Sequence, residues 1–255
     1  MATEPNARAM HNSGQIDTTF DFRSDTPQGM DPDAWSPTLR RYHKLLWSKP
    51  LPNGVVFELV DTTPGVYLHH RSQLGEFRLT SDAVIPTFRK QARLAPVFER
   101  IPEELSTFGR IGYTIGGMML FPGNRIGGQA TINIARGFHP LIKDRFDLTV
   151  ECIRRHYLGE DSPLSAVLDR YADFFRLFGD FRGYVEFFLL QDLVTEDFAE
   201  VRFFAPFEGF TPWPVPSTAE AYADYRIRAI GFIEARNRRI SALSCSRPTP
   251  HDSRA

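Results

Sequence analysis

The sequence predicts an α+β fold, in which an antiparallel sheet from the N-terminal half packs with a helix-rich C-terminal half in a single domain. Runs of β-branched and aromatic residues cluster up to Ile134, and helical periodicity dominates after it. The two patterns do not alternate, which argues against βαβ units. The 255 residues are 42% hydrophobic and 24% charged, an ordinary globular composition, and no repeat or low-complexity linker divides them.

The first element is a helix from Pro37 to Trp47. Ser36 precedes it as an N-cap, Pro37 is favoured at the first helical position, and Pro50 and Pro52 end it. Three short runs of strand-forming residues follow, each closed by turn residues: Val55–Val60, Val66–His69 and Glu76–Thr80.

Two further strands are expected on either side of a Pro-Gly-Asn turn, the first from Tyr113 and the second centred on Thr131 to Ile134. Apolar residues then recur with helical spacing. The later elements are helices along the face from Ile142 to Tyr157, from Ser162-Pro163 to Gly179, from Phe181 to Val194, and from the capping box Ser217-x-x-Glu220 to about Ile240, with a short strand at Val201–Pro206.

The two ends of the chain lack periodicity. Residues 1–19 and 241–255 are expected to be disordered tails around a domain of residues 20–240. No run approaches the roughly 18 to 20 apolar residues that a membrane helix needs, and no apolar segment follows the N-terminal charges. Two cysteines, Cys152 and Cys245, form no disulfide framework, so we expect a cytoplasmic protein without a membrane partner.

Several blocks of the chain carry a family resemblance. They are "FDFRSDTPQGMDPDAWSPTLRRYHKLLWSKPLPNG", "YLHHRSQLGEFRLTSD", "GGMMLFPGNRI", "TINIARG", "DRFDLTVECIRRHYLGEDSPL" and "DFRGYVEFFLLQDLV". Together they resemble a bacterial family catalogued only as a domain of unknown function. The resemblance implies one domain and a bacterial source, and it implies no activity.

The first block supplies an acidic group of four residues, Asp21, Asp25, Asp31 and Asp33. Carboxylate oxygens bind hard cations, which makes Mg²⁺ a candidate cofactor and Asp21 and Asp25 candidate catalytic residues. The alternative is structural, because aspartates also start turns and helices by accepting hydrogen bonds from nearby backbone amides.

His69 is a third catalytic candidate. It lies with His70 at the end of a predicted strand, before Arg71 and Ser72. A histidine followed by a small hydroxyl residue resembles the way ADP-ribosyltransferases hold the ribose of NAD. Adjacent strand residues face opposite sides, so one of the two histidines at most points into a given pocket, and a surface histidine pair is the alternative.

A group of arginine and asparagine residues predicts an anion site. Arg125, Asn133 and Arg136 occupy predicted loop or strand-end positions, where an arginine fork suits phosphate. Further charges follow on the next helix, where Asp147 with Arg154, or Glu151 with Arg155, are expected to form ion pairs.

The helix at Pro37–Trp47 carries Arg40, Arg41 and Lys44 beside its apolar face, and Trp47 and Lys49 lie at its end. An aromatic ring beside cations can stack a base and hold its phosphate, which adds Trp47 and Lys49 as substrate-binding candidates. In the alternative, Trp47 continues the buried stripe. The formal net charge of −1 gives no global attraction to nucleic acid, so such a partner needs this local face.

These residues lead to three functional hypotheses. The first is an enzyme acting on a nucleotide or other phosphorylated substrate. The second is a non-catalytic nucleic-acid or protein binding accessory of a mobile-element or defence system. The third is NAD-dependent ADP-ribosyl transfer. The chain has no Walker loop, no G-x-S-x-G and no zinc signature, which keeps the second hypothesis open.

Overall fold

The computed structural model describes residues 15–61, 67–85 and 94–246. Three antiparallel strands in the order β1-β2-β3 form its sheet. They are β1 (Leu68–Ser72), β2 (Gly75–Ala83) and β3 (Met118–Pro122). Strand β2 is central and longest, because its first half pairs with β1 and its second half with β3. The predicted antiparallel sheet and the α+β class are confirmed.

The strands predicted outside this sheet are not regular strands in the structure. Residues 55–60 contribute isolated bridges, Pro50 with Val56 and Val60 with His69, and the expected strand at 201–206 is a single bridge at Val201. The prediction of a strand around Thr131 to Ile134 is wrong. The Thr131 hydroxyl accepts a hydrogen bond from the Ile134 amide and so starts a helix where the residue types favour a strand.

Helices make up most of the remaining chain. They are α1 (Pro32–Trp35), α2 (Pro37–Trp47), α3 (Ala95–Phe98), α4 (Pro102–Gly112), α5 (Ile132–Phe138), α6 (Phe146–Leu158), α7 (Ser165–Arg170), α8 (Ala172–Arg176), α9 (Phe181–Phe188) and α10 (Ala219–Ser246). Helix α2 has its predicted bounds, since Ser36 Oγ accepts a hydrogen bond from the Leu39 amide at 3.0 Å.

Three predicted helix bounds need correction. The segment expected to run from Ser162-Pro163 to Gly179 begins at Ser165 and is two helices, because Tyr171 between α7 and α8 departs from helical geometry, with its hydroxyl donating to the Asn124 carbonyl at 2.7 Å. Helix α9 ends at Leu189, which adopts a left-handed φ of 57°, rather than at Val194. Helix α10 is capped by Thr218, not Ser217, through a hydrogen bond from the Ala221 amide.

Both predicted tails include residues that belong to the folded domain. Helix α10 continues to Ser246, six residues beyond Ile240. At the other end, Ile16 is buried and the Asp17 amide donates to the Tyr42 hydroxyl at 2.8 Å. The rest of both predicted tails, residues 1–14 and 247–255, lies outside the described residues.

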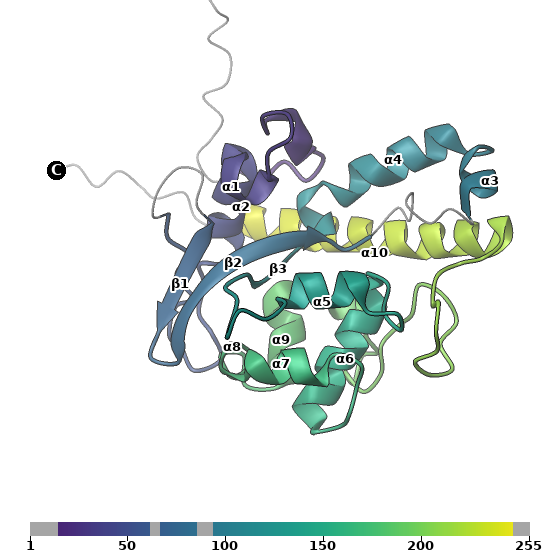
Figure 1. Cartoon of the computed structure of the whole chain (residues 1–255). Helices are drawn as coiled ribbons and strands as arrows, with labels where there is room; N and C mark the ends of the chain where they lie inside the picture. Colours follow the sequence, from purple (N-terminus) through teal and green to yellow (C-terminus); the bar gives the residue numbers. More distant parts are fainter. Residues whose placement is uncertain (1–14, 62–66, 86–93, 247–255) are drawn as a thin grey trace, which may run out of the picture.

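Helix α10 runs through the middle of the molecule, with α1, α2 and α4 on one side and α5 to α9 on the other (Figure 1). Its Arg236 is fully buried and donates to the carbonyls of Phe188, Gly116 and Met118, which joins α9, the segment before β3, and β3 itself. Burial lowers the pKa of Arg236 to about 9. These hydrogen bonds satisfy carbonyl groups that would otherwise be orphaned in the core.

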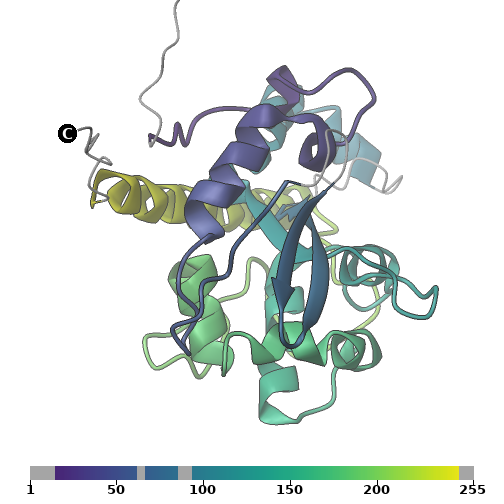
Figure 2. The same cartoon turned by 90° about the vertical axis from the view of Figure 1, so that its left-hand side faces the viewer.

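The hairpin of β1 and β2 extends past α2 toward the helices of the second half (Figure 2). Its Phe77 ring lies 5.5 Å from the ring of Phe174 on α8. Phe174 in turn contacts Phe178, which belongs to an aromatic core shared with α9 and α2. The sheet and the C-terminal helices therefore form one hydrophobic core.

Candidate functional site

The last residues of β2 form a polar centre where the strand meets α1 and α5. Successive strand residues face opposite sides, so Thr80 and Asp82 face one way and Ser81 the other. Each side chain has a partner on a helix. Asn133 and Arg136 of α5 contact Thr80 and Asp82, and Asp33 of α1 contacts Ser81. Residues far apart in the sequence are brought together here.

Arg136 is the central residue of this site. It is fully buried, and its Nη1 lies 2.7 Å from Asp82 Oδ2 and 2.7 Å from Asp144 Oδ1. Its Nε donates to Thr149 Oγ1 at 3.1 Å, and its Nη2 donates to the Asp144 carbonyl at 3.0 Å. One guanidinium therefore holds two carboxylates from different elements, and we call these three residues the Asp82–Arg136–Asp144 triad.

The two carboxylates are partly exposed while the arginine is buried, and the Asp144 Oδ1 atom at Arg136 is itself buried. Their side chains are 34% exposed for Asp82 and 32% for Asp144. Desolvation raises the pKa of Asp144 to about 6, against the lowering effect of the Arg136 charge, and the nearby Asp82 carboxylate adds to the rise. A carboxyl group that titrates near neutral pH can accept and donate a proton under physiological conditions.

The turn that carries Asp144 has an uncommon backbone. Lys143 and Asp144 both adopt left-handed φ angles, 48° and 66°, and Trp213, whose amide donates to the Pro140 carbonyl, has a φ of 61°. These are three of the five non-glycine residues with positive φ in the described part of the chain. Such conformations cost about 1 to 3 kcal/mol each and concentrate at functional sites.

A buried ion pair supports this turn. Arg145 and Asp147 are both nearly inaccessible and hydrogen-bond to each other, and Arg145 also donates to the carbonyls of Pro214 and Ala205. Asp147 in turn accepts a hydrogen bond from the Phe204 amide at 2.8 Å. The segment around 204–214 is therefore fixed to the start of α6, next to Asp144.

The other side of β2 carries a buried acid. Asp33 is 6% exposed and accepts hydrogen bonds from the Ser81 amide, at 2.6 Å, and from the Ser81 hydroxyl. Burial raises its pKa to about 8, although the hydrogen bonds from Ser81 oppose the rise. A neutral carboxylic acid therefore lies directly behind Asp82, where an ionised one would repel that carboxylate.

His43 of α2 lies beside this acid, with Nε2 3.9 Å from Asp33 Oδ1. Its Nδ1 accepts a hydrogen bond from Trp47 Nε1 at 3.1 Å, which places the ring proton on Nε2. Burial lowers the pKa of His43 to about 3, so the histidine is neutral. The two groups therefore form no salt bridge at neutral pH.

The predicted acidic group at the N-terminus is dispersed rather than gathered. Asp21 caps the 3₁₀ turn Phe22–Ser24 and pairs with Arg23. Asp25 accepts hydrogen bonds from Ser36 Oγ at 2.5 Å and from the Thr38 amide at 3.1 Å, at the start of α2. Both carboxylates therefore make the contacts of the structural alternative, in which aspartates start turns and helices.

His69 lies on the edge strand β1, away from the triad. Its Nδ1 is 2.9 Å from Glu76 Oε1 across the hairpin, and its Nε2 is buried without a hydrogen-bond partner. His70 faces the other side of the strand, stacked on Phe57 with ring centroids 4.0 Å apart. The expected opposite orientation of the two histidines is confirmed.

The predicted anion group divides into three environments. Arg136 is buried, and its guanidinium contacts Asp82, Asp144 and Thr149 rather than solvent. Asn133 donates to Thr80 Oγ1 at 3.2 Å and keeps a buried Oδ1 without a partner. Arg125 is exposed on the loop before α5, so its role in phosphate binding stays a prediction. On α6, Glu151 pairs with both Arg154 and Arg155.

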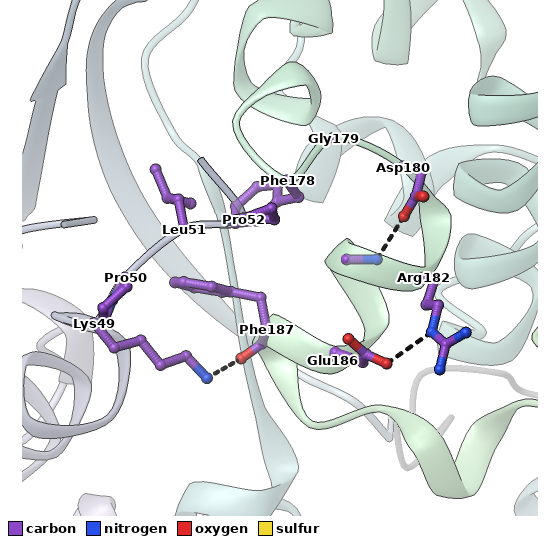
Figure 3. A pocket seen from close by; sticks show the side chains of 11 residues that line it. Lys49, Pro50, Leu51, Pro52, Phe178, Gly179, Asp180, Arg182, Glu186 and Phe187 are labelled. Atoms are coloured by element: carbon purple, nitrogen blue, oxygen red, sulfur yellow. Dashed lines mark hydrogen bonds and ion pairs between the residues drawn. The ribbon is translucent and has the colours of Figure 1, made fainter. Parts of the chain in front are cut away.

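Trp47 and Lys49 have different positions. The Trp47 ring is buried against Phe187 and Phe188 and belongs to the core, which removes it as a stacking platform. Lys49 lines a shallow hollow of about 490 Å³ between residues 49–52 and 178–187. Its Nζ donates to the Phe187 carbonyl at 2.5 Å and lies over the Phe187 ring (Figure 3).

The charges around this hollow already have protein partners. Arg182 pairs with Glu186 at 2.9 Å, and Asp180 accepts a hydrogen bond from the Gly183 amide at 2.7 Å (Figure 3). Two basic residues of α2 also have an acidic partner, since Arg40 and Lys44 both pair with Asp61. These pairings reduce the positive potential that a nucleic acid would meet on this side.

Two residues of the triad, Asp82 and Asp144, carry little signal in the sequence that would mark them as site residues. Asp82 stands alone after a strand, with no motif around it. Asp144 lies among helix-forming charges and is typical of a solvated helix start. The available signal was weak: two charged residues, Lys143 and Asp144, between Pro140 and the next helix.

No group of three or more histidine, cysteine or acidic side chains suited to a metal ion occurs in the residues described above. Because Mg²⁺ is usually held by one or two carboxylates together with water or phosphate, its binding stays a prediction. In residues 15–61, 67–85 and 94–246, no helix has the length and apolar character needed to span a membrane.

Comparison with known proteins places the chain in a family. No significant match exists among curated proteins or among solved structures. One family model matches residues 16–240, which includes the sheet, the triad and nearly all of α10. The resemblance seen in the sequence blocks is confirmed, and the bacterial source stays a prediction. The chain belongs to a family of unknown function, DUF6994.

Proposed function

We propose that this protein is an enzyme that acts on a nucleotide or another phosphorylated small molecule by acid–base catalysis. Asp144 is the general acid or base, Asp82 is the second carboxylate, and Arg136 positions both. The observation that carries the proposal is the geometry at Arg136 Nη1, which lies 2.7 Å from an oxygen of each carboxylate.

Charge supports this division of roles. Two carboxylates share one buried cation, so protonation of one of them leaves the triad neutral. A group whose proton affinity is set by a neighbour in this way is suited to exchanging protons near neutral pH. The partial exposure of both carboxylates leaves them within reach of a substrate.

The triad does not itself supply a phosphate site, because Arg136 is enclosed by protein groups. In our proposal the phosphate is held by cations outside the triad, and Arg125, which is exposed on the loop before α5, is one candidate. Arginine suits that role because its planar guanidinium can donate two hydrogen bonds to a phosphate.

The experiment is a turnover screen of the purified protein. Nucleotides, sugar phosphates and NAD are incubated with the wild type and followed by ¹H and ³¹P NMR. We expect conversion of at least one phosphorylated compound and a loss of about 100-fold or more in Asp144→Asn, the scale of a lost general acid or base. Asp82→Asn is expected to lower the rate as well.

Asp21→Asn is the matched control, since Asp21 is also paired with an arginine but lies outside the triad. Its rate should stay within twofold of the wild type. Thermal melts of all three variants separate lost chemistry from lost structure. A folded Asp144→Asn variant with undiminished turnover would refute the acid–base role.

The binding hypothesis stays as the second candidate and uses the same samples. A protein that converts nothing in the screen, yet binds short oligonucleotides in a salt-sensitive manner, is a binding protein and not an enzyme of this class. Cytoplasmic location stays a prediction in either case. Consumption of NAD that depends on His69 would instead favour ADP-ribosyl transfer.

A further inference from the structure

Two exposed aromatic rings lie at the turn that carries Asp144. Phe138 is 81% exposed at the end of α5, and Trp213 is 54% exposed. They are the most exposed aromatic side chains of the described residues. In a chain whose other large rings are mostly buried, two such rings beside one turn mark a surface suited to contact with a ligand.

Backbone hydrogen bonds hold Trp213 beside this turn. Its backbone amide donates to the Pro140 carbonyl at 3.3 Å, and the next residue, Pro214, accepts a hydrogen bond from Arg145 at 2.8 Å. The backbone of Trp213 itself is left-handed, which is rare for a bulky residue. The side chain is 54% exposed, so about half of its surface stays accessible to a ligand.

A cation accompanies the ring. Lys143 Nζ lies 4.7 Å from the centroid of the Trp213 ring. Lys143 directly precedes Asp144, so the cation belongs to the same turn as the acid of the triad, and the Trp213 ring lies beside that turn. An aromatic face with an adjacent ammonium group is the combination that binds a base through stacking and its phosphate through charge.

We infer that Trp213 and Lys143 form the nucleotide-binding part of the site, with the base stacked on the indole and the phosphate near the ammonium group. The inference rests on the proposed function and narrows its substrate class from phosphorylated compounds to nucleotides. Sugar phosphates lack the planar ring, and uncharged nucleosides lack the group that Lys143 attracts.

The test uses tryptophan fluorescence in a Trp35→Phe background. Trp35 is 43% exposed and would add its own signal, whereas Trp47 is buried and serves as a constant reference. The probes are adenosine 5′-monophosphate, adenosine and ribose 5-phosphate. We expect saturable quenching by the nucleotide, weaker binding of the nucleoside, and no quenching by the sugar phosphate.

Three further variants divide the contributions. Trp213→Leu should abolish the quenching and weaken nucleotide binding measured by calorimetry at least tenfold. Lys143→Ala should weaken nucleotide binding about two- to fivefold, the scale of a partly exposed charge contact, and leave adenosine binding unchanged. Lys44→Ala is the matched control, because Lys44 lies on α2 and is paired with Asp61. This substitution should change neither nucleotide binding nor adenosine binding.

The outcomes separate this inference from the proposed function. Nucleotide binding that survives in Asp144→Asn while turnover is lost supports both. Equal binding by the wild type and Trp213→Leu, equal binding of ribose 5-phosphate and the nucleotide, or no nucleotide binding would overturn the inference. Turnover of a sugar phosphate that depends on Asp144 would then leave the acid–base proposal standing without a nucleotide.

Discussion

The substitution Asp33→Asn tests how charge is distributed around β2. Asp33 is 6% exposed and burial raises its pKa from 3.8 to about 8. An asparagine has the shape of the protonated acid, can accept the hydrogen bond of the Ser81 amide and can donate to the Ser81 hydroxyl. The variant therefore keeps the contacts of the neutral side chain and removes its ability to ionise.

The direction of the effect follows from the raised pKa. Below pH 3.8 the acid is protonated in both the folded and the unfolded protein. As the pH rises above that value, the unfolded chain loses this proton while the folded protein retains it. The free energy of unfolding of the wild type therefore falls steadily, until Asp33 also ionises in the folded state near pH 8.

The magnitude follows from the same two pKa values. They differ by about 4, and each pKa unit corresponds to about 1.4 kcal/mol, so the wild type loses up to about 6 kcal/mol between pH 4 and pH 8 from this group. Asp33→Asn escapes that loss. We expect the variant to equal the wild type near pH 4 and to be more stable by about 2 to 6 kcal/mol at pH 8.

The assay is urea unfolding of both proteins at pH values from 4.5 to 9, followed by tryptophan fluorescence. Asp21→Asn serves as the control without a pH trend in this range, because desolvation of Asp21 is outweighed by hydrogen bonds from Arg23, its pKa is lowered, and its contribution to stability therefore changes only below about pH 3.8. An Asp33→Asn variant less stable than the wild type at pH 8 would refute the reasoning. It would mean that Asp33 is ionised and held by Ser81.

Two other predictions concern packing. Gly183→Ala on α9 places a Cβ 2.1 Å from the Phe178 carbonyl oxygen, so we expect a loss of about 2 kcal/mol or more in urea unfolding, whereas Gly231→Ala on α10 meets no atom within 4 Å and should gain about 0.5 to 1 kcal/mol. Equal effects of the two would contradict the geometry. Burial raises the pKa of the Cys152 thiol to about 12, so this thiol should resist thiol reagents at pH 8 until the protein unfolds, and rapid native labelling at Cys152 would contradict its burial.

The sequence predicts best where local chemistry decides the structure. Helix α2 was predicted to the residue because Ser36, Pro37 and the following prolines act on neighbouring residues. The β1–β2 hairpin follows from alternating apolar residues and a short turn. In both cases the stabilising contacts lie within a few residues of one another, so a single sequence contains them.

Prediction fails where a local preference meets a tertiary demand. The residues Thr131 to Ile134 favour a strand, yet Thr131 caps α5, and α5 is needed to bring Arg136 to Asp82. Helix α4 was missed although Pro102 precedes Leu105 and Phe108 at helical spacing, because its apolar face is short.

The triad could not be predicted because its members are joined only by the fold. Asp82 ends a strand, Arg136 lies on α5 and Asp144 occupies a left-handed turn, at separations of 54 and 8 residues from the arginine. The sequence predicts an anion site around Arg136, but a charge in a sequence does not reveal whether it faces solvent or neighbouring carboxylates. Because Arg136 is buried, we propose that it positions the two carboxylates rather than binding a ligand.

The most direct test of the central claim is the titration of Asp144 in the folded protein. Aspartate labelled with ¹³C at the carboxyl carbon gives one NMR signal per residue, and the signal missing in Asp144→Asn assigns it. The account predicts a midpoint at about pH 6 for Asp144. A midpoint below that of an ordinary exposed aspartate, about 3.9, would show a carboxylate held permanently ionised by Arg136 and would contradict its role as a proton-exchanging group.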